Sequence, residues 1–596
     1  MKNPNTQNIK CAICGKHMAQ NGVIHGAQRW ICQTRIGGKQ VVCSRLMHKY
    51  QPVTLTGTTE ITSIVPRNWP PTLKVKFHKP ASRHFRVTNI NGKPIQPVEV
   101  APAPELTEEE QKKKELEEQI AAANAACARS LAGVKTFVIS AAQNATPANL
   151  EFLGCLKTLA AAKGASLVFP RYRYKNATSI WTEQQEESEW WAKELTPYLW
   201  DSRLELCPGL VLLADASIQP TASNPLSGFD AMTSAASGIV GHPKVELKTI
   251  ASPANSTGPK IMTTTGAVTV ANYTSTKSGR LGFFHHAYAA LLVEVEGSDF
   301  HIRHVHFSNE SKSVIDLTHE YFADGRIEEA QRPVAVVLGD VHVGTTSKLV
   351  EEATFGKGGI VEVLQPEHIV AGDIFDGLSC NPHSKGDPFQ AVALEGSDRN
   401  DVQKEVEEAW NWIVSRTPVG STFVAVPDNH GDFLRRWLCA TDWRLDPKNA
   451  EFYLKLASKL VQSAVVEDGG PRYAGALKTA FESLPQPTDG KAIRLLHEDE
   501  SFMLAGIELG VHGHRGPNGS RGSIRNLRRL GNKSVIGHSH SPGIDEGTYQ
   551  VGTSTELRLS YNSGPSSWAH CHCVVHHSGK RQLLFISGKG AWRRGN

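Results

Sequence analysis

The stretch PVAVVLGDVHVG (residues 333–344) decides the fold of the C-terminal half. Its apolar run ends abruptly in Asp340 and His342, as expected of a buried strand that presents polar side chains at its C-terminal end. Four further stretches repeat this pattern: HIVAGDIFDG (368–377), FVAVPDNHGD (423–432), LGVHGH (509–514) and VIGHSH (535–540). The five stretches predict an α/β fold whose strand ends gather Asp, Asn and His side chains.

These residue types are the usual ligands of divalent cations. Carboxylate, imidazole and amide oxygen suit ions such as Mn²⁺, Fe²⁺ or Zn²⁺. Two ions about 3.5–4 Å apart can clamp the attacking and leaving oxygens of a phosphoryl group. One Asp-x-His triplet is common by chance, but five such strand ends in series are specific. The pattern therefore predicts a two-metal phosphoesterase.

The five motifs resemble those of the calcineurin-like metallophosphoesterases, which include SbcD-type nucleases and serine/threonine phosphatases. The resemblance covers roughly residues 332–593 and implies a two-layer β-sandwich flanked by helices. It also implies two divalent ions, Mn²⁺ ahead of Fe²⁺, Zn²⁺ or Mg²⁺. By this resemblance one ion is held by Asp340, His342, Asp373 and His540, and the other by Asp373, Asn429, His512 and His538.

The same resemblance gives His430 a catalytic role near the scissile phosphate, where it stabilises charge or protonates the leaving oxygen. Asp376 is then the carboxylate that orients His430, with Asp432 as the competing partner. The third motif departs from the family pattern in two ways. Asp428 stands where the family usually has Gly, and Gly431 separates His430 from Asp432.

A basic run lies between the fourth and fifth motifs. Five cations beside predicted metal ligands suit contact with the DNA backbone independent of base sequence. A solvated basic helix is the alternative. The predicted DNA-binding residues are Arg515, Arg521, Arg525, Arg528 and Arg529.

The N-terminal residues 1–50 predict a small zinc-ribbon-like module. Cys11 and Cys14 form a Cys-x-x-Cys half-site, and Cys32 and Cys43 supply two further thiolates. A stretch this short and poor in large apolar residues would need one structural Zn²⁺ to fold. Unliganded thiols in a loose tail are the alternative.

The segments between the zinc module and the first motif are of three kinds. Residues 51–106 are rich in Pro, Thr and cations, which predicts a basic tether or a small β unit. Residues 107–131 predict a spacer helix capped by Thr107, with oligomerisation as an alternative role. Residues 132–325 predict an α/β domain that opens with a βαβ unit: strand 134–140, helix 147–163 and strand 165–170.

The order of the middle segments, followed by the phosphoesterase motifs, resembles the pre-early DNA-transfer proteins of certain tailed phages. This resemblance implies a phage-encoded nuclease directed at host DNA. The net charge of +5 over 596 residues predicts no particular partner by itself, so any nucleic-acid footprint must be local. The chain has neither an apolar leader nor a run of about 18 apolar residues, which predicts a cytoplasmic protein without membrane contact.

We therefore expect a metal-dependent DNA nuclease of the host cytoplasm. SbcD-type relatives are dimeric, so the resemblance also implies a homo-oligomer. One alternative is a phosphomonoesterase of the same superfamily. It is disfavoured by Gly377, which follows Asp376 where the phosphatases carry a phosphate-gripping Arg. The other alternative is a non-catalytic regulator that binds nucleic acid.

Overall fold

The computed structural model describes residues 131–595, apart from residues 132, 175–189, 217, 254–257, 385 and 468–469, together with short strands between residues 18 and 94. The chain forms two compact units, Met1–Leu116 and Glu117–Asn596.

The first unit contains an antiparallel sheet of β1 (Met18–Ile24), β2 (Ala27–Cys32) and β5 (Ser44–His48). Its remaining strands are two residues long and pair as hairpins: β3 (Arg35–Ile36) with β4 (Lys39–Gln40), β6 (Phe77–His78) with β7 (Arg86–Val87), and β8 (Asn89–Ile90) with β9 (Lys93–Pro94).

Most of the predicted zinc site cannot be placed in this unit. Cys11, Cys14 and Cys43 lie outside the described residues, and Cys32 is the last residue of β2. The predicted spacer helix, up to residue 130, also lies outside the described residues. The zinc site and the spacer helix therefore stay predictions.

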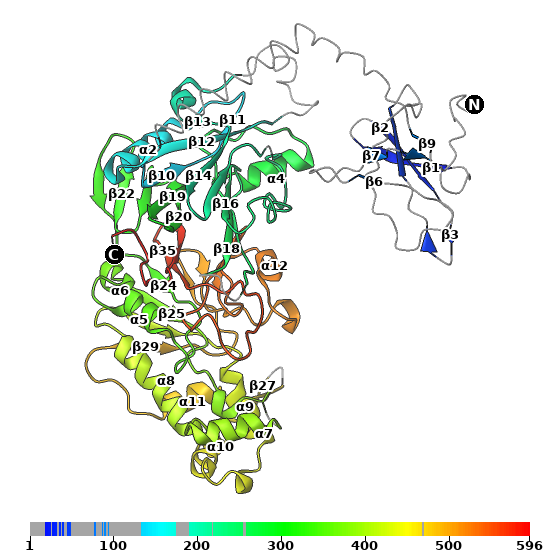
Figure 1. The fold of residues 1–596 in the computed structure, drawn as a ribbon. Helices are drawn as coiled ribbons and strands as arrows, with labels where there is room; N and C mark the ends of the chain where they lie inside the picture. Colours follow the sequence, from blue (N-terminus) through cyan, green and yellow to red (C-terminus); the bar gives the residue numbers. More distant parts are fainter. Residues whose placement is uncertain are drawn as a thin grey trace. The chain divides into compact units, whose positions relative to one another are not determined.

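The second unit is built on three large sheets (Figure 1). The nine-stranded sheet confirms the predicted βαβ unit, because β10 (Thr136–Ile139) and β12 (Ser166–Tyr172) are parallel and α2 (Leu150–Lys163) connects them. The Asn149 side chain caps α2 by accepting a hydrogen bond from the Phe152 amide, and Gly164 ends the helix in the left-handed region. The strands run in the order β11 (Ala142–Gln143), β12 (Ser166–Tyr172), β10 (Thr136–Ile139), β19 (Ala289–Glu296), β20 (Asp299–Ser308), β21 (Ser313–Asp316), β22 (His319–Phe322) and β23 (Ile327–Glu329), with β13 (Leu199–Trp200) paired to β12.

A buried ionic network links three strands of this sheet. The Arg303 guanidinium on β20 donates to both oxygens of Asp316 on β21, over 2.5 and 2.9 Å, and to Glu294 on β19 over 2.6 Å. Lys163 at the end of α2 lies 3.1 Å from Asp316. Burial raises the pKa of Asp316, but the charge of Arg303 outweighs it and holds the pKa well below the usual range. The network therefore keeps its charges because each has a partner.

The ten-stranded sheet draws strands from both segments that the sequence divides at about residue 325. It runs β14 (Arg203–Cys207), β15 (Leu210–Leu213), β16 (Ser237–Val240), β18 (Lys260–Thr264), β17 (Glu246–Ile250), β33 (Gly543–Asp545), β34 (Thr548–Gln550), β32 (Lys533–Ile536), β31 (Ile507–Glu508) and β30 (Met503–Leu504). The antiparallel pairing of β17 with β33 joins the two segments. Residues 132–325 and 332–593 thus share one sheet.

The six-stranded sheet carries the first three sequence motifs. Its order is β29 (Ala492–Leu495), β26 (Thr422–Ala425), β25 (His368–Ala371), β24 (Ala335–Val337), β35 (Cys571–Val575) and β36 (Arg581–Phe585). The first four strands of this order are mutually parallel, so their C-terminal ends meet at one edge. The strands predicted from the apolar runs at residues 334–338, 368–371 and 423–426 are confirmed.

The two faces of this sheet have different partners. Val337 and Val370 share a core with Val535 of the ten-stranded sheet and with Val551, the residue after β34. Val336, Ile369 and Phe423 face the other way and pack against helices, including Val406 and Trp410 of α8 (Val402–Arg416). The mixed α/β class expected from the sequence is confirmed, whereas its assignment to the metallophosphoesterase sandwich stays a prediction.

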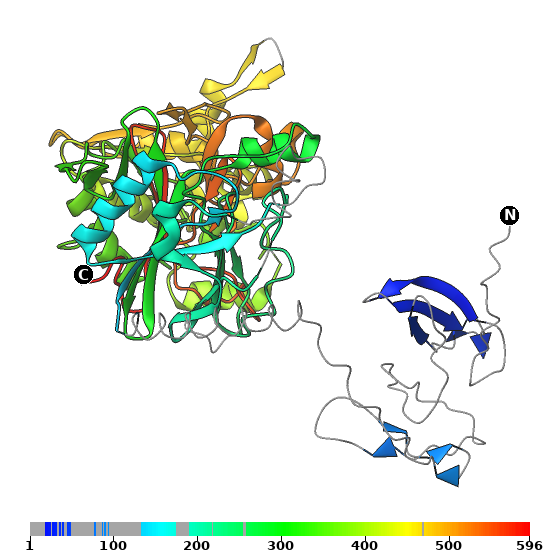
Figure 2. The same cartoon turned by 90° about the horizontal axis from the view of Figure 1, so that it is seen from above.

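Helices fill the connections between the motifs, and Figure 1 shows α7 to α11 together at one end of this unit. The hairpin of β27 (Val465–Glu467) and β28 (Gly470–Arg472), yellow in Figure 2, projects beyond them. No helix among the described residues is long and apolar enough to cross a membrane. The remaining helices are α4 (Lys277–His285), α5 (Lys348–Phe355), α6 (Ile360–Leu364), α7 (Pro388–Gly396), α9 (Gly431–Ala440), α10 (Ala450–Ser463), α11 (Ala476–Glu482) and α12 (Ile524–Leu527), with 3₁₀ turns η1 (Lys193–Tyr198), η2 (Leu378–Cys380), η3 (Trp443–Leu445), η4 (Pro517–Gly519) and η5 (Arg528–Leu530).

Candidate metal centre

The predicted ligands come from two sheets that pack face to face. The loops after the parallel strands β24, β25 and β26 bring in Asp340 and His342, then Asp373 and Asp376, then Asn429 and His430. The loops after β31 and β32, which are parallel neighbours in the ten-stranded sheet, bring in His512, His514, His538 and His540. The parallel strands on each side explain why residues up to 200 positions apart meet at one place.

The ligand-type atoms form two groups that share Asp373. In the first, one atom each from His342, Asp373 and His540 lies within 4.8 Å of the others. His342 Nε2 is 3.2 Å from His540 Nε2 and 3.6 Å from Asp373 Oδ2. Asp340 Oδ2 is 3.2 Å from His540 Nε2, which brings the fourth predicted ligand to this group.

The second group consists of Asp373, His512 and His538, again within 4.8 Å of one another. His512 Nε2 lies 3.0 Å from Asp373 Oδ2. Asn429 Oδ1 lies 3.0 Å from His538 Nδ1, which places the predicted amide ligand beside this group. All seven predicted metal ligands are therefore brought together, in the two sets that the resemblance implies.

The residues present fit a cation because several of their polar atoms are buried without a hydrogen bond. These atoms are Asp340 Oδ2, Asp373 Oδ1 and His512 Nε2. His512 Nε2 makes no hydrogen bond although Asp373 Oδ2 is close, since distance alone does not satisfy the angular requirement. Unpartnered buried polar groups are rare in native proteins. These buried His and Asp groups could hold a metal ion, which would satisfy the unpaired atoms.

Four of the predicted ligands also have a strained backbone. His342, Asp373, His538 and His540 have φ angles of 48°, 47°, 73° and 58°, in the left-handed region that side-chain-bearing residues rarely adopt. Each such residue costs on the order of 1–3 kcal/mol and clusters of them are typical of functional sites. The strain indicates that the position of the side chains, rather than local stability, determines the conformation of these loops.

The charges of the centre shift the pKa values of its own residues. Burial lowers the pKa of His512, but Asp373 and Asp340 outweigh burial and raise it to about 10. Burial raises the pKa of Asp373, but His512 and His430 outweigh burial and hold it well below its usual value. The protein alone thus stabilises a proton on His512, and a cation would compete with that proton.

His430 lies beside the first group. Its Nδ1 donates to the backbone carbonyl of Asp376 over 2.5 Å, which leaves Nε2 as the second ring nitrogen. The Asp376 carboxylate is 3.9 Å from His430 Nδ1 and instead accepts a hydrogen bond from His342 Nδ1 over 3.0 Å. Asp376 therefore contacts His430 through its main chain, and its side chain orients His342. Burial lowers the pKa of His430, but Asp373 and the Asp376 carbonyl outweigh burial and raise it.

Asp432, the competing partner in the sequence interpretation, faces a group of arginines. Its carboxylate lies 3.4 Å from Arg435, 3.8 Å from Arg436 and 3.4 Å from Arg515. We refer to Asp432 and these three arginines together as the arginine group. Asp432 thus organises positive charge on one side of the centre.

Two supporting residues were not assigned roles from the sequence. Asp428 accepts hydrogen bonds from the amides of Asp373, over 2.7 Å, and Gly431, over 2.6 Å, so it ties two ligand loops together. Burial and then the charge of Asp373 raise the pKa of Asp428 to about 7. His572 on β35 accepts from the amide of Gly339, over 2.9 Å, and fixes the turn that precedes Asp340. The departure of Asp428 from the family pattern was a visible signal, whereas His572 lies outside the five motifs.

Arg399, in the loop after α7, also approaches the centre. A Cβ atom at Gly344 would lie 2.5 Å from its Nη2 atom, which is buried and has no hydrogen-bond partner among the described residues. Burial raises the pKa of Asp376, but its neighbours outweigh burial and lower it. His342 and His430 contribute most to the lowering, and the positive charge of Arg399 contributes less. A guanidinium from a distant loop therefore lies near Asp376.

The predicted DNA-binding arginines differ in their surroundings. Arg528 is engaged in ion pairs with Asp545 over 2.6 Å and Glu546 over 3.3 Å, and Arg515 belongs to the arginine group. The other three side chains are exposed and form no ion pair within the part of the chain that the structure describes: Arg521, Arg525 and Arg529.

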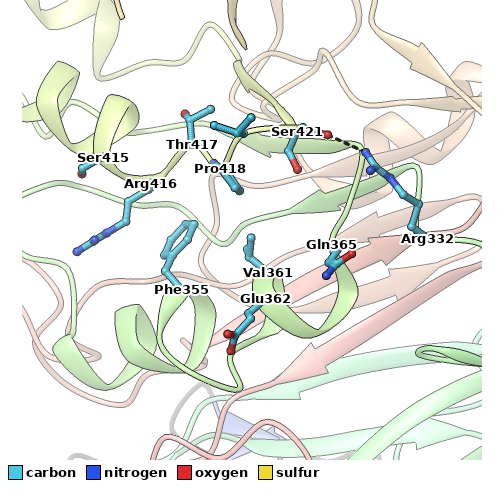
Figure 3. A pocket seen from close by; sticks show the side chains of 12 residues that line it. Arg332, Phe355, Val361, Glu362, Gln365, Ser415, Arg416, Thr417, Pro418 and Ser421 are labelled. Carbon is cyan, nitrogen blue, oxygen red and sulfur yellow. Dashed lines mark hydrogen bonds between the residues drawn. The ribbon is translucent and has the colours of Figure 1, made fainter. Parts of the chain in front are cut away.

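A cavity of about 460 Å³ lies at the opposite edge of the six-stranded sheet (Figure 3). Its lining includes Arg332, Gln365 and Ser421, which precede β24, β25 and β26, and Arg332 donates to the Gly420 carbonyl over 2.9 Å. The predicted metal ligands of the first three motifs follow the same strands at their C-terminal ends. This cavity contains no histidine and none of the predicted ligands, so it is not the metal centre.

Comparison with known proteins finds a relative that aligns with most of the chain. The chain is 29% identical over 466 residues to Protein A1 of Escherichia phage T5, a match that spans 76% of this chain and 82% of the relative. This chain resembles a phage protein. The resemblance to phage proteins expected from the order of the segments is thereby confirmed. No family model matches the chain, and neither does any solved structure.

Proposed function

We propose that this chain is a phage-encoded, metal-dependent phosphodiesterase that hydrolyses DNA. The observation that carries the proposal is the pair of buried ligand groups joined at Asp373. Two cations sharing one carboxylate are the arrangement used for in-line displacement at phosphorus. Mn²⁺ is our first candidate because the donor set combines carboxylates with imidazoles.

The chain's own residues have separable tasks in this proposal. When bound, the two cations supply the positive charge that offsets charge developing on the phosphoryl oxygens and acidify the attacking water. His430 carries a proton at Nε2 to the departing sugar oxygen, while its Nδ1 stays fixed on the Asp376 carbonyl. Asp376 fixes the ring of His342 through Nδ1, and Asp428 fixes the backbone of Asp373.

DNA is the proposed substrate because three arginines that form no ion pair among the described residues lie near the predicted ligands in the sequence. Arg521, Arg525 and Arg529 are exposed between the predicted ligands His512 and His538 in the sequence, where they can neutralise backbone phosphates. Arg399 is the observation that favours a phosphomonoesterase instead, since a guanidinium beside the centre could bind the additional charge of a terminal phosphate.

The decisive experiment compares supercoiled DNA, linear end-blocked DNA and a small phosphomonoester, each with Mn²⁺. The wild-type chain is run beside the double variant Asp340→Ala/His342→Ala and the control double variant Asp324→Ala/His577→Ala, whose side chains are partly exposed away from the ligand groups. We expect loss of both DNAs with the wild type and the control, and none with the ligand variant. Phosphomonoester turnover with intact DNA would replace the proposal by the phosphomonoesterase.

Two further expectations complete the proposal. A homo-oligomer would appear as a multiple of 65.0 kDa in sedimentation equilibrium. One structural Zn²⁺ would remain with the purified chain and would be lost on replacing Cys11 and Cys14 by Ser.

A further inference from the structure

A second cavity, of about 690 Å³, adjoins the metal centre. Asp428, which holds the Asp373 amide, and Gly431, which follows His430, both line it. The walls come from α9, α11, the loop after β29 and the C-terminal end of the projecting hairpin. Ligand pockets in proteins are typically about 300–1,000 Å³, so the cavity is large enough for a small organic anion.

Positive charge on one wall is arranged by a single carboxylate. Asp432 is shared by the guanidinium groups of Arg435 and Arg515, both of which line the cavity. The contacts of 3.4 Å are long for charge-assisted hydrogen bonds, and each guanidinium has five N–H donors. The wall can therefore accept a phosphate without losing its organisation.

The other cations and the acids of the lining are distributed around this wall. Lys478 is paired with Glu482, and Glu498 lies 3.4 Å from Arg515. Arg472 and Asp499 also line the cavity. Glu498 and Asp499 lie in the loop after β29. On the Arg435 side the acid is Asp432, which is already engaged by two guanidinium groups, so this side is the place for an anion.

An aromatic side chain stands on the same side as Arg435. Tyr473 lines the cavity together with Arg435 and is 47% exposed. A partly exposed aromatic ring that shares a cavity with guanidinium groups can serve as a platform on which a nucleobase stacks. Phosphate-binding cations and a stacking ring thus line one cavity beside the metal centre.

We propose that this cavity binds one nucleotide of the substrate strand next to the scissile phosphate, with its phosphate on Arg435 and Arg515 and its base against Tyr473. The inference rests on the proposed function, since the metal centre next to it is the place where the strand would be cut. It goes further by assigning a nucleotide subsite to residues outside the five motifs. A free nucleoside 5′-monophosphate should therefore occupy the cavity and compete with DNA.

The test uses the full chain with Mn²⁺ and 2′-deoxyadenosine 5′-monophosphate as the probe, beside inorganic phosphate and ribose 5-phosphate. The probe should inhibit DNA hydrolysis competitively and at least 10-fold more strongly than the other two. Arg435→Gln and Tyr473→Ala should each weaken probe inhibition and raise the KM for DNA on the order of 10-fold, with a smaller change in kcat. Arg444→Gln, an exposed arginine in η3 outside the lining, is the matched control and should change neither constant.

Equal inhibition by the probe and by inorganic phosphate, or unchanged constants in both cavity variants, would overturn the nucleotide subsite while leaving hydrolysis intact. Failure of the wild-type chain to cleave DNA or bis(p-nitrophenyl) phosphate would instead overturn the proposed function. In that case calorimetric titration of the Mn²⁺-loaded chain with the same probe still decides the cavity, because Tyr473→Ala must weaken binding. Unchanged metal content and circular dichroism of each variant establish that it is folded.

Discussion

Replacing Gly372 by alanine tests the metal centre through a residue that is not itself a ligand. A Cβ atom at this position would lie 2.5 Å from Nδ1 of His512, whereas ordinary contact begins at 3.4 Å. The imidazole ring would have to move by about 0.9 Å to relieve the contact. Gly372 does not have a positive φ angle, so the added methyl group acts through this contact and not through backbone strain.

A displacement of this size is several times the tolerance of about 0.2 Å for metal–ligand distances. We therefore expect Mn²⁺ affinity at the group containing His512 to fall about 10–100-fold, as it does when residues that orient ligands are changed. Isothermal titration calorimetry with Mn²⁺ measures the change. The control is Gly396→Ala, at the end of α7, where an added Cβ meets no atom within 4 Å. Wild-type affinity for two ions in Gly372→Ala would refute the placement of His512 as a ligand.

Four further predictions concern separate parts of the chain. His430→Ala should retain the bound metal but lose about 10²–10⁴-fold in kcat, because it removes a positioned proton donor; normal turnover would contradict that role. Arg303→Met should lower the free energy of unfolding in urea by about 3–5 kcal/mol, because Glu294 then stays buried without its partner and Asp316 keeps only Lys163. Arg326→Met, which removes an exposed ion pair with Asp324, is the control and should change the free energy of unfolding little. Burial lowers the pKa of His304 to about 4. The neutral imidazole therefore contributes fully to the free energy of unfolding above pH 6.5, and about 3 kcal/mol of that free energy is lost as the pH falls toward 4. His304→Gln should show a correspondingly smaller pH dependence in urea unfolding. Replacing the exposed Arg521, Arg525 and Arg529 by Gln should reduce the slope of log K for duplex DNA against log salt by about 3, because each phosphate contact contributes about 0.9. Fluorescence anisotropy measures the slope.

The local pattern of the chain determined the elements that carry the centre. Apolar runs that end in Asp, Asn or His are encoded within about ten residues, so β24, β25 and β26 and their polar ends could be predicted from the sequence. The βαβ unit at the start of the second compact unit followed in the same way, because periodicity and caps such as Asn149 are local features. Burial of the predicted ligands is a consequence of the same runs.

Only the tertiary structure decided which of these ends meet and how they orient one another. His342 and His540 are 198 positions apart, and their contact depends on the packing of two sheets. The Asp376 carboxylate orients His342 rather than His430, and Asp432 holds arginines, because loop geometry and not spacing sets the direction of each side chain. Arg399, His572 and Tyr473, which lines the second cavity, lie outside the five motifs. The physical reason is that periodicity records which side chains are buried, whereas the partners of a buried polar group are set by long-range packing.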